Sequence, residues 1–269
     1  MIAENNTAIE NQSSLDEKDF SKAQGHWILA QMGKKILRPG GKRMTNALLD
    51  MLQIGPAHKV VEFAPGLGYT ARRILKQEPS YYYGIEKDPR AVDLLRSKIK
   101  GSTIQFKEAN AAHSELEAGS IDKVYAEAML TMQADHRKSE IVAEAFRILK
   151  PGGQYAIQEM GLDCDEKQKA EIQRDLAKEI KVNARPLTRE EWIQLLQEQG
   201  FRVKEITKSP MHLLEPARMI DDEGLFGALS IVWRIVNNPA AKKRILGMRR
   251  VFRNYQKNIY AIGLVAEKP

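Results

Sequence analysis

Strand and helix patterns alternate along residues 59–160, and this alternation constrains the fold more than any other feature of the sequence. Runs rich in β-branched and aromatic residues predict strands, and stretches with apolar residues at helical spacing separate them. The expected strands cover 59–64, 81–87, 103–109, 123–129 and 153–160, with helices at 69–77, 89–99 and 138–149. Strands joined by such helices indicate right-handed crossovers and a parallel sheet, whose ligands bind at the carboxyl ends of the strands.

The C-terminal part of the chain predicts two more strands, at 201–209 and 258–269. Thr188 is expected to cap a helix at 189–199, because Glu191 three residues later completes a capping box. The residues between these two strands, 211–256, are largely helical in pattern. An insert of this length near the ligand-binding end of a sheet predicts a lid.

The N-terminal part divides into a tail and a helical cap. Residues 1–20 lack periodicity and predict a flexible tail. A helical pattern over 21–37 stops at Arg38-Pro39-Gly40-Gly41, and a second helix is expected at 44–52. We therefore expect a cap at 21–57 that leads into a cofactor-binding core at 58–160.

Composition excludes several classes of protein. No apolar run approaches the roughly 18 residues of a membrane span, and the polar start is no signal peptide, so we expect a cytoplasmic protein without a transmembrane segment. Cys164 is the only cysteine, which excludes an intramolecular disulfide and a cysteine-based zinc site, and the histidines show no metal-ligand spacing. We expect no metal.

The net charge of +7 is concentrated near the C-terminus. Residues 242–257 contain seven basic residues and no acidic one. Such a run is either a solvated helix face or a patch for phosphates, anionic lipid or an acidic substrate.

The stretch "VVEFAPGLGYTA" at 60–71 forms a bare turn between the first strand and its helix. Gly66 and Gly68 satisfy the spacing of a dinucleotide-binding loop, and Glu86 lies at the tip of the second strand about 20 residues on. A carboxylate there accepts hydrogen bonds from ribose hydroxyls, which NAD and S-adenosylmethionine both carry. The loop alone does not separate these two cofactors.

Glu62 favours the second cofactor. It places a negative charge at the end of the first strand, where it would repel a pyrophosphate and attract the ammonium group of a methionine moiety. This charge disfavours a dinucleotide.

Five motifs in register carry a family resemblance. The segments "VVEFAPGLGYTA", "YYGIEKDP", "FKEANAAHSEL", "SIDKVYAEAML" and "RILKPGGQYAI" resemble, in order and spacing, the motifs of class I S-adenosylmethionine-dependent methyltransferases. The resemblance implies a Rossmann-like, mostly parallel seven-stranded α/β sheet with its last strand antiparallel, and helices on both faces. It also implies S-adenosylmethionine as cofactor and S-adenosylhomocysteine as product.

The resemblance assigns the cofactor-binding residues one by one. Glu62 would orient the methionine amino group, and Glu86 would bind both ribose hydroxyls. The turn against the cofactor would consist of Ala64, Pro65, Gly66 and Gly68; Lys87 would lie near the adenine, which Asn110 and Ala111 would face; Ala126 and Glu127 would border the methyl group.

Two positions depart from the family pattern. Ala64 replaces the usual first glycine of the turn, which is tolerable if its φ stays negative. Asn110 replaces a carboxylate, and its amide oxygen can still accept a hydrogen bond from adenine.

A catalytic base is required only for some acceptors. Methyl transfer from a sulfonium depends on aligning the nucleophile with an activated methyl group, but a hydroxyl acceptor benefits from a base. Glu127 and His136 are the candidates, with Glu159 nearby; the bland alternative for His136 is a structural or solvent-facing histidine at a helix start.

The acceptor and partners follow less directly. After the fourth strand, "YAEAML" lacks the Asn/Asp-Pro-Pro-aromatic motif that grips exocyclic amines of bases, so a nucleic-acid acceptor is disfavoured and we expect a small molecule, hydrophobic or aromatic. The apolar stretch 225–236 predicts a buried lid helix; its alternatives are a hydrophobic mouth for the acceptor and a peripheral membrane contact.

Two rival functions stay open: an NAD(P)-dependent oxidoreductase, and an RNA-binding or membrane-binding protein that uses its basic C-terminal region. The oligomeric state is undetermined, with a dimer as one option.

Overall fold

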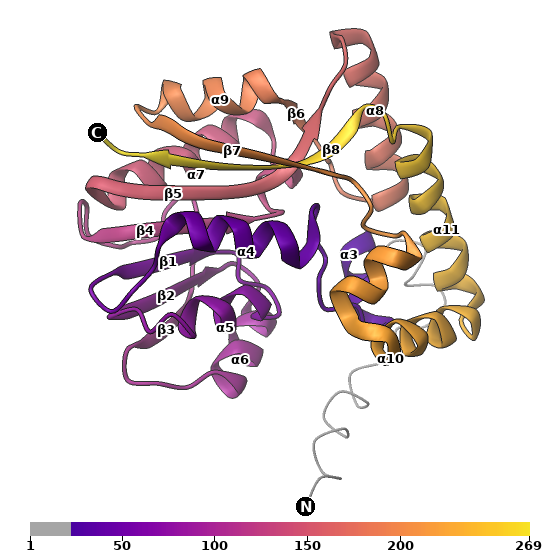
Figure 1. Cartoon of the computed structure of the whole chain (residues 1–269), viewed down its shortest axis with the longest axis horizontal. Coiled ribbons are helices and arrows are strands. Elements are labelled where there is room, and N and C mark those ends of the chain that lie inside the picture. The colour runs from indigo at the N-terminus through magenta and orange to yellow at the C-terminus, as the bar shows by residue number, and fades with distance from the viewer. Residues whose placement is uncertain (1–22) are drawn as a thin grey trace, which may run out of the picture.

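The computed structural model describes residues 23–269, and the expected tail at 1–20 lies outside the described residues. At its centre is an eight-stranded sheet flanked by helices (Figure 1). The strands are β1 (Lys59–Phe63), β2 (Tyr81–Glu86), β3 (Ile104–Glu108), β4 (Ile121–Glu127), β5 (Leu149–Leu162), β6 (Leu187–Thr188), β7 (Arg202–Pro210) and β8 (Ile259–Glu267). Their order across the sheet is β3-β2-β1-β4-β5-β8-β7, and β6 pairs with β5.

The directions of the strands confirm the predicted fold class. β1 to β5 pair in parallel, whereas β8 runs antiparallel between β5 and β7. Only the two-residue β6 was not expected. β1 lies in the middle of the parallel part, between β2 and β4, so the turn after Phe63 opens at the carboxyl edge of the sheet.

The helices fall into two groups. Those of the sheet domain are α4 (Gly41–Leu52), α5 (Tyr69–Leu75), α6 (Pro89–Lys98), α7 (Asp135–Ile148) and α9 (Arg189–Glu198), with the 3-10 turn η1 (Leu130–Met132). The others are α3 (Gly25–Gln31), α8 (Glu166–Ile180), α10 (Pro216–Val236) and α11 (Pro239–Asn254). The capping box expected at Thr188 is present at the start of α9.

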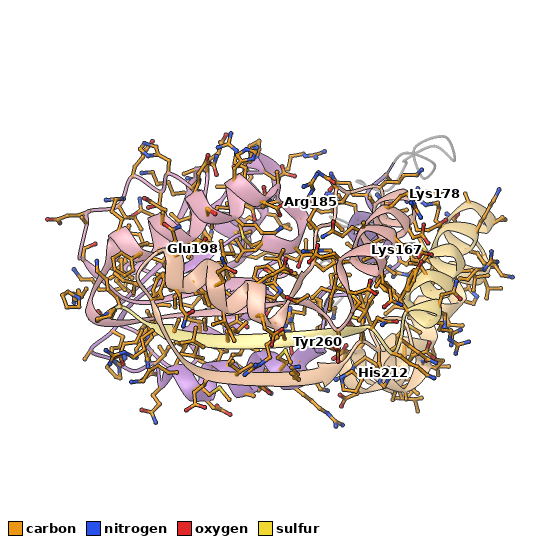
Figure 2. The ribbon with its side chains drawn as sticks, turned by 90° about the horizontal axis from the view of Figure 1, so that it is seen from above. Lys167, Lys178, Arg185, Glu198, His212 and Tyr260 are labelled. Atoms are coloured by element: carbon orange, nitrogen blue, oxygen red, sulfur yellow. The ribbon has the colours of Figure 1, made fainter. Side chains whose placement is uncertain are left out.

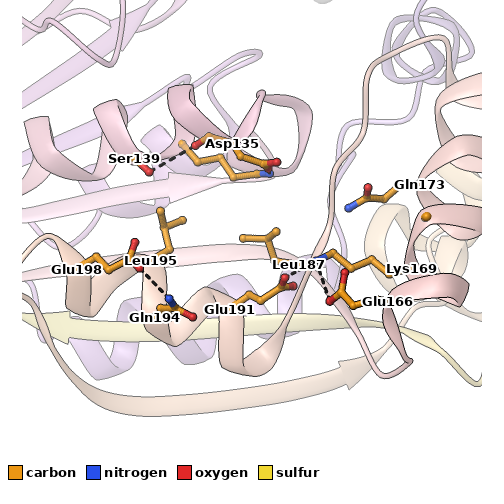
Figure 3. A pocket seen from close by; sticks show the side chains of 12 residues that line it. Asp135, Ser139, Glu166, Lys169, Gln173, Leu187, Glu191, Gln194, Leu195 and Glu198 are labelled. Carbon is orange, nitrogen blue, oxygen red and sulfur yellow. Dashed lines mark hydrogen bonds and ion pairs between the residues drawn. The ribbon is translucent and has the colours of Figure 1, made fainter.

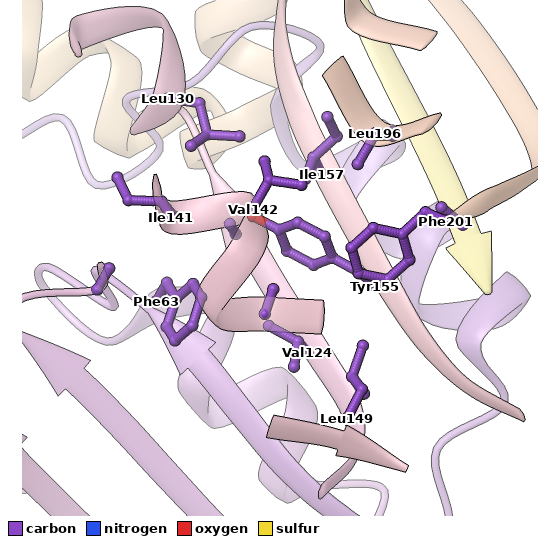
Figure 4. Packing of buried hydrophobic residues seen from close by; sticks show 14 of the residues in the cluster. Phe63, Val124, Leu130, Ile141, Val142, Leu149, Tyr155, Ile157, Leu196 and Phe201 are labelled. Carbon is purple, nitrogen blue, oxygen red and sulfur yellow. The ribbon is translucent and has the colours of Figure 1, made fainter. Parts of the chain in front are cut away.

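Alternation along the strands creates a core on each face of the sheet. Val60 and Tyr82 pack against α4, α5 and α6 on one face, whereas Val61, Phe63 and Tyr155 pack against α7 and α9 on the other (Figure 4). Both cores are fully buried. They hold the strand ends rigidly, which fixes the positions of the side chains that follow each strand.

The second group of helices forms a lobe beside the sheet. α3, α8, α10 and α11 share a third apolar core with the far ends of β5 and β8, at the right of Figure 1. In the view from above, α8 and α11 stand beside the end of β8 that carries Tyr260, and His212 lies between β7 and α10 (Figure 2). We call α10 and α11 the insert lobe.

Three local features differ from expectation. The first helix ends at Gln31 and does not run to residue 37, because Gly33 adopts a left-handed φ of 93° that terminates it. α8 was not predicted. α10 is broken at Gly224, whose φ and ψ of 77° and 165° are not helical, so two helical segments meet there at a kink. The division of the chain into cap, core and insert stays a prediction.

Candidate functional site

A cavity of about 380 Å³ opens at the carboxyl ends of β1, β2 and β4. Its walls come from the glycine turn, the strand tips and the loop that follows α3. The residues predicted for the cofactor that line it are Glu62, Ala64, Pro65, Gly66, Glu86, Lys87, Asn110, Ala111 and Glu127. Segments far apart in the sequence thus converge on the place where the pattern of strands predicts a ligand.

The glycine turn presents bare backbone to this cavity. Gly66 has a φ of 55°, and a Cβ added to it would meet only the Ala64 carbonyl oxygen, at 3.9 Å. Gly68, with a φ of 76°, faces away and packs closely on Leu95. A group bound in the cavity can therefore approach the backbone at Gly66.

The condition under which an alanine is tolerable at position 64, a negative φ, is not met. Its φ is 55°, in the left-handed region that disfavours a side chain, and its N–H donates to the Ile85 carbonyl oxygen at 2.8 Å. Ala128, directly after β4, has a φ of 53° and also lines the cavity. Two alanines on neighbouring strand ends thus hold conformations normally left to glycine, a form of backbone strain that clusters at functional sites.

Glu86 is fixed by the backbone around it. One carboxylate oxygen accepts from the N–H groups of Lys87 and Asp88 at 2.8 and 3.1 Å, and the other accepts from Gly66 at 3.0 Å. A carboxylate has about four acceptor positions, so about one remains for a ligand. Glu86 can accept from both hydroxyls of a ribose only if one of these backbone hydrogen bonds breaks.

Glu62 is a buried acid at the cavity wall. Its side chain accepts a hydrogen bond from the Tyr82 hydroxyl at 2.5 Å. Burial raises the pKa of Glu62 to about 8, the Tyr82 bond opposes this rise, and the Glu127 charge adds to it. A cation placed beside Glu62 would favour its ionised form.

Arg38 enters the same cavity from the loop after α3, and its role there was not predicted from the sequence. Its Nε lies 2.8 Å from a Glu127 carboxylate oxygen, and its Cζ lies 4.5 Å from the centre of the Tyr69 ring. The Arg38 side chain is 6% exposed, and its Nη2 has no hydrogen-bond partner among residues 23–269. A buried guanidinium nitrogen without a partner marks a place for an anion.

Four donor side chains contact the Glu127 carboxylate. Besides Arg38, it accepts from Thr45 at 2.9 Å, from Tyr125 at 2.8 Å and from Thr70 at 3.2 Å. The contacts hold Glu127 and Arg38 in one orientation. No local pattern in the sequence indicates this network, because its members come from separate segments.

Gln158 anchors the loop that carries Arg38. The buried Gln158 amide donates to the Pro39 carbonyl oxygen at 2.5 Å, and its oxygen lies 3.2 Å from both the Thr45 and Tyr125 hydroxyls. The Arg38-Pro39-Gly40-Gly41 segment is therefore more than a helix stop, because it fixes a charged side chain in the cavity.

The remaining predicted site residues lie at different depths. Asn110 is exposed at the rim, and its side-chain oxygen accepts from the Ala112 N–H at 3.0 Å. Lys87 is also exposed, whereas Ala111 is buried. Ala126 is fully buried within β4 and does not line the cavity.

The two further candidates for a base lie outside this network. His136 is exposed in the first turn of α7 and does not line the cavity, although Arg137 does. Glu159 is buried and accepts from the N–H groups of Met129, Leu130 and Thr131 at 2.8 to 3.0 Å. Burial raises the pKa of Glu159 against these bonds, and its contacts show a structural role at the start of η1.

The insert lobe does not line the cavity, but it holds the loop that does. The Glu223 carboxylate accepts from the N–H groups of Lys35 and Ile36 at 2.8 and 2.9 Å. Asp222 lies 3.7 Å from the buried Lys34 ammonium and accepts from the Lys42 N–H at 3.1 Å. The predicted buried lid helix at 225–236 is wrong, because Phe226 and Trp233 there are 86% and 68% exposed.

A second hollow lies between α7, α8 and α9 (Figure 3). Most of its charged side chains pair with one another: Lys138 with Asp135 at 2.6 Å, and Lys169 with Glu191 and Glu166, while Glu198 accepts from the Gln194 amide. These pairs satisfy the charges that a ligand would otherwise need to meet. The hollow is less suited to a charged ligand than the strand-end cavity.

Residues 23–269 contain neither a metal-binding cluster nor a membrane-spanning helix. No group of three or more His, Cys, Asp or Glu in that range is arranged to hold a metal ion. No helix within the same range is long and apolar enough to cross a membrane.

Comparison with known proteins identifies the family. The profile of a family described as "Methyltransferase domain" matches residues 60–153, the segment that carries the glycine turn and the strand-end acids. An uncharacterised protein of Haemophilus influenzae is 34% identical over 248 residues, which cover 91% of this chain and 98% of that relative. The chain belongs to the class I S-adenosylmethionine-dependent methyltransferases.

Solved structures of other proteins share the fold of this methyltransferase. The MccD protein superposes with a TM-score of 0.65 at 16% identity, covering 86% of this chain and 99% of MccD. The phosphoethanolamine N-methyltransferase 2 of Haemonchus contortus, solved with phosphomonomethylethanolamine and S-adenosylhomocysteine, superposes with a TM-score of 0.64 at 18% identity. That match covers 97% of this chain and 59% of the nematode protein.

Proposed function

We propose that the strand-end cavity binds S-adenosylmethionine and that the protein transfers its methyl group to a small acceptor. The observation that carries this proposal is the meeting of Arg38 and Glu62 in one cavity. Arg38 offers a buried nitrogen without a partner among the described residues, and Glu62 offers a buried carboxyl group whose pKa responds to the Arg38 charge. A cation and an acid so placed complement the carboxylate and ammonium groups of an amino acid.

The other groups of the cofactor would find matching residues along the same wall. Gly66 admits the ligand close to the backbone, and Glu86 keeps an acceptor position for a ribose hydroxyl. Asn110 lies at the rim and Ala111 is buried beside it, where an adenine would rest. The residues present therefore fit the cofactor that the family uses.

Charge explains why this site would prefer a cationic cofactor. The carboxyl groups of Glu62, Glu86 and Glu127 line one cavity, and their charges act on one another. Each of these carboxyl groups that ionises would repel a pyrophosphate, which disfavours the oxidoreductase alternative. When bound, the sulfonium cofactor supplies an activated methyl group.

The contribution of the protein to the reaction is orientation. We propose that Arg38 fixes the carboxylate end of the cofactor and that Glu127, saturated with donors, positions Arg38 in place of removing a proton. His136 stays a prediction as a base; its exposed position outside the cavity lining favours a structural or solvent role.

The apolar part of the cavity supports a small, hydrophobic or aromatic acceptor. Trp27, Leu37, Met129, Met132 and Ile141 contribute to its lining. Thioether and aromatic surfaces of this kind accommodate apolar molecules of varied shape. A cavity of this size is suited to a small molecule.

The experiment compares two ligands that differ only in the amino-acid part. S-adenosylhomocysteine contains that part, and methylthioadenosine lacks it. We expect Arg38→Met to weaken the binding of S-adenosylhomocysteine by roughly 10-fold to 150-fold, since a charged hydrogen-bonded pair contributes about 1.5–3 kcal/mol. Methylthioadenosine should bind the variant and the wild type equally.

The control is Arg43→Met, which removes an arginine on α4 that is exposed and paired with Asp221. It should leave both affinities unchanged. Equal weakening of the two ligands by Arg38→Met would contradict the assignment of Arg38 to the carboxylate. Absence of binding by both ligands to the wild type would contradict the proposed function.

A further inference from the structure

The second half of α10 exposes a continuous apolar face. After the kink at Gly224, large side chains recur at positions i, i+1, i+4, i+7, i+8 and i+11, the spacing of one side of a helix. These side chains are Leu225, Phe226, Leu229, Val232, Trp233 and Val236, each at least 43% exposed. We call this set the α10 face.

Internal packing does not explain the α10 face. The opposite side of the same helix supplies Ile231 to the core shared with α3, α8 and α11, and Ala228 on that side is also buried. The helix is therefore already anchored by its inner side. An exposed apolar surface that packing does not require marks an interaction site.

Basic side chains are exposed on α11, the helix that follows α10 and packs against it. Residues 225–257 contain no acidic residue. Lys242, Lys243 and Arg250 are exposed on one side of α11 together with Leu246, which is 46% exposed. These three cations have no ion pair with residues 23–269, whereas Arg249 and Arg253 are held by Glu215.

The charge pattern decides between two occupants of this surface. A second copy of the chain, related by two-fold symmetry, would bring a second set of the same basic residues into one interface. Like charges brought together in this way oppose association. An anionic lipid surface complements both the cations and the apolar side chains, and an aromatic residue such as Trp233 is typical of that interface.

We propose that the α10 face and the basic side of α11 dock on an anionic membrane surface. Phe226 and Trp233 would enter the boundary between headgroups and acyl chains, and Lys242 and Lys243 would contact the headgroups. The docking segment begins at Gly224, one residue after Glu223, which holds the backbone of Lys35 at the cavity wall. The membrane contact would thus lie next to the loop that carries Arg38, and it does not depend on which acceptor is methylated.

The test is sedimentation of the full chain with vesicles. One set contains only phosphatidylcholine, and the other adds phosphatidylglycerol. We expect the protein to sediment with the anionic vesicles and to be released by salt. Phe226→Ser with Trp233→Ser should lower the partition coefficient at least about tenfold, because two large apolar side chains no longer leave water.

Two charge variants separate a local role from net charge. Lys242→Ser with Lys243→Ser should weaken binding to anionic vesicles by about fivefold for each charge removed. The matched control, Lys98→Ser with Lys100→Ser, removes the same charge from an exposed site at the end of α6. It should leave binding unchanged, and S-adenosylhomocysteine should bind all four proteins equally.

Several results would overturn the proposal. The wild type could fail to sediment with anionic vesicles, or the two charge variants could weaken binding equally. A dimer that Phe226→Ser with Trp233→Ser converts to a monomer would assign the α10 face to a second copy. RNA binding lost in the Lys242 and Lys243 variant, without any vesicle binding, would assign the basic side to a nucleic acid.

Discussion

The strand-end cavity and the insert lobe use their side chains in opposite ways. In the cavity, charged groups are buried and hydrogen-bonded to one another, as Arg38, Glu127 and Glu86 show. In the insert lobe, large apolar groups such as Phe226 lie in water. Buried charges and exposed apolar side chains both cost free energy unless a partner compensates for them. We infer a zwitterionic cofactor as the partner of the cavity and an apolar surface as the partner of the insert lobe.

The two regions meet at residues 34–43. Asp222 and Glu223 hold this segment from the lobe, and Gln158 holds it from the sheet. Arg38 lies between these anchors. The position of its guanidinium group therefore depends on both regions, and the predictions below separate their contributions.

Among substitutions at the junction of the two regions, the largest expected loss of stability comes from cutting the link at Asp222. Lys34 is buried with Asp222 in an ion pair whose side chains are both 0% exposed, and burial already lowers the pKa of Lys34. Asp222→Asn should lower the free energy of unfolding by about 3 kcal/mol, because it leaves a buried charge with only the more distant Glu223. Denaturant unfolding measures this change.

Asp221→Asn is the matched control for the link. Asp221 pairs with Lys42 and Arg43 nearer the surface, so its replacement should cost at most about 1 kcal/mol. Equal losses for the two variants would show that the buried pair does not hold the lobe to the loop.

The pH dependence of the cavity comes next, at about 1.4 kcal/mol for each pH unit. The pKa of Glu62 is about 8 in the folded protein against an ordinary value of 4.5, so between these values the folded protein keeps a proton that the unfolded chain has lost. Stability without ligand should therefore fall as pH rises from about 5 to 8. Glu62→Gln should lack this slope in unfolding curves measured across that range.

Ligand affinity should change with the opposite sign. The ammonium group of S-adenosylhomocysteine requires ionised Glu62, so its affinity should rise with pH up to about 8, by at most about tenfold for each unit. Methylthioadenosine, which has no ammonium group, should show no such rise. A flat profile for S-adenosylhomocysteine would contradict the contact with Glu62.

A smaller effect is expected at the glycine turn. Ala64→Gly should raise the free energy of unfolding by about 0.5–1 kcal/mol, because the φ of 55° costs an alanine more than the added flexibility costs a glycine. Ala109→Gly is the control: it also lines the cavity but has no positive φ, so it should be destabilising. Thermal unfolding of both variants tests the sign.

The smallest effect belongs to the exposed lobe. Phe226→Ser should change the free energy of unfolding by less than about 0.5 kcal/mol, because Phe226 is 86% exposed. Phe63→Ala, in the sheet core, should cost about 3–5 kcal/mol. A large loss of unfolding free energy in Phe226→Ser would show that Phe226 is covered in the folded protein.

The sequence predicted the sheet and the acids at its edge for a simple physical reason. Strand periodicity and helix spacing are local, and side chains that end parallel strands must meet at one edge. Glu62 and Glu86 were found in this way. The alternation of strand and helix patterns also predicted the fold class, whereas the order of the strands across the sheet was not predicted.

The parts that the sequence did not predict depend on distant contacts. Arg38 reads locally as a helix stop, and only Glu127 and Gln158 show that its side chain is held in the cavity. The apolar run at 225–236 reads as buried, because hydrophobicity alone does not say whether another element covers a helix. The positive φ of Ala64 likewise depends on the strand that its N–H contacts.

The most direct test of the account is calorimetric titration of the wild type and Glu86→Ala with S-adenosylmethionine, S-adenosylhomocysteine and NADH. We expect the wild type to bind S-adenosylmethionine and S-adenosylhomocysteine. Glu86→Ala should weaken both roughly 100-fold or more, since the ribose contact and the support of the Gly66 turn are lost together. NADH should not bind. Binding of NADH alone, or equal binding of S-adenosylhomocysteine by both proteins, would contradict the proposal that the strand-end cavity binds S-adenosylmethionine through Glu86.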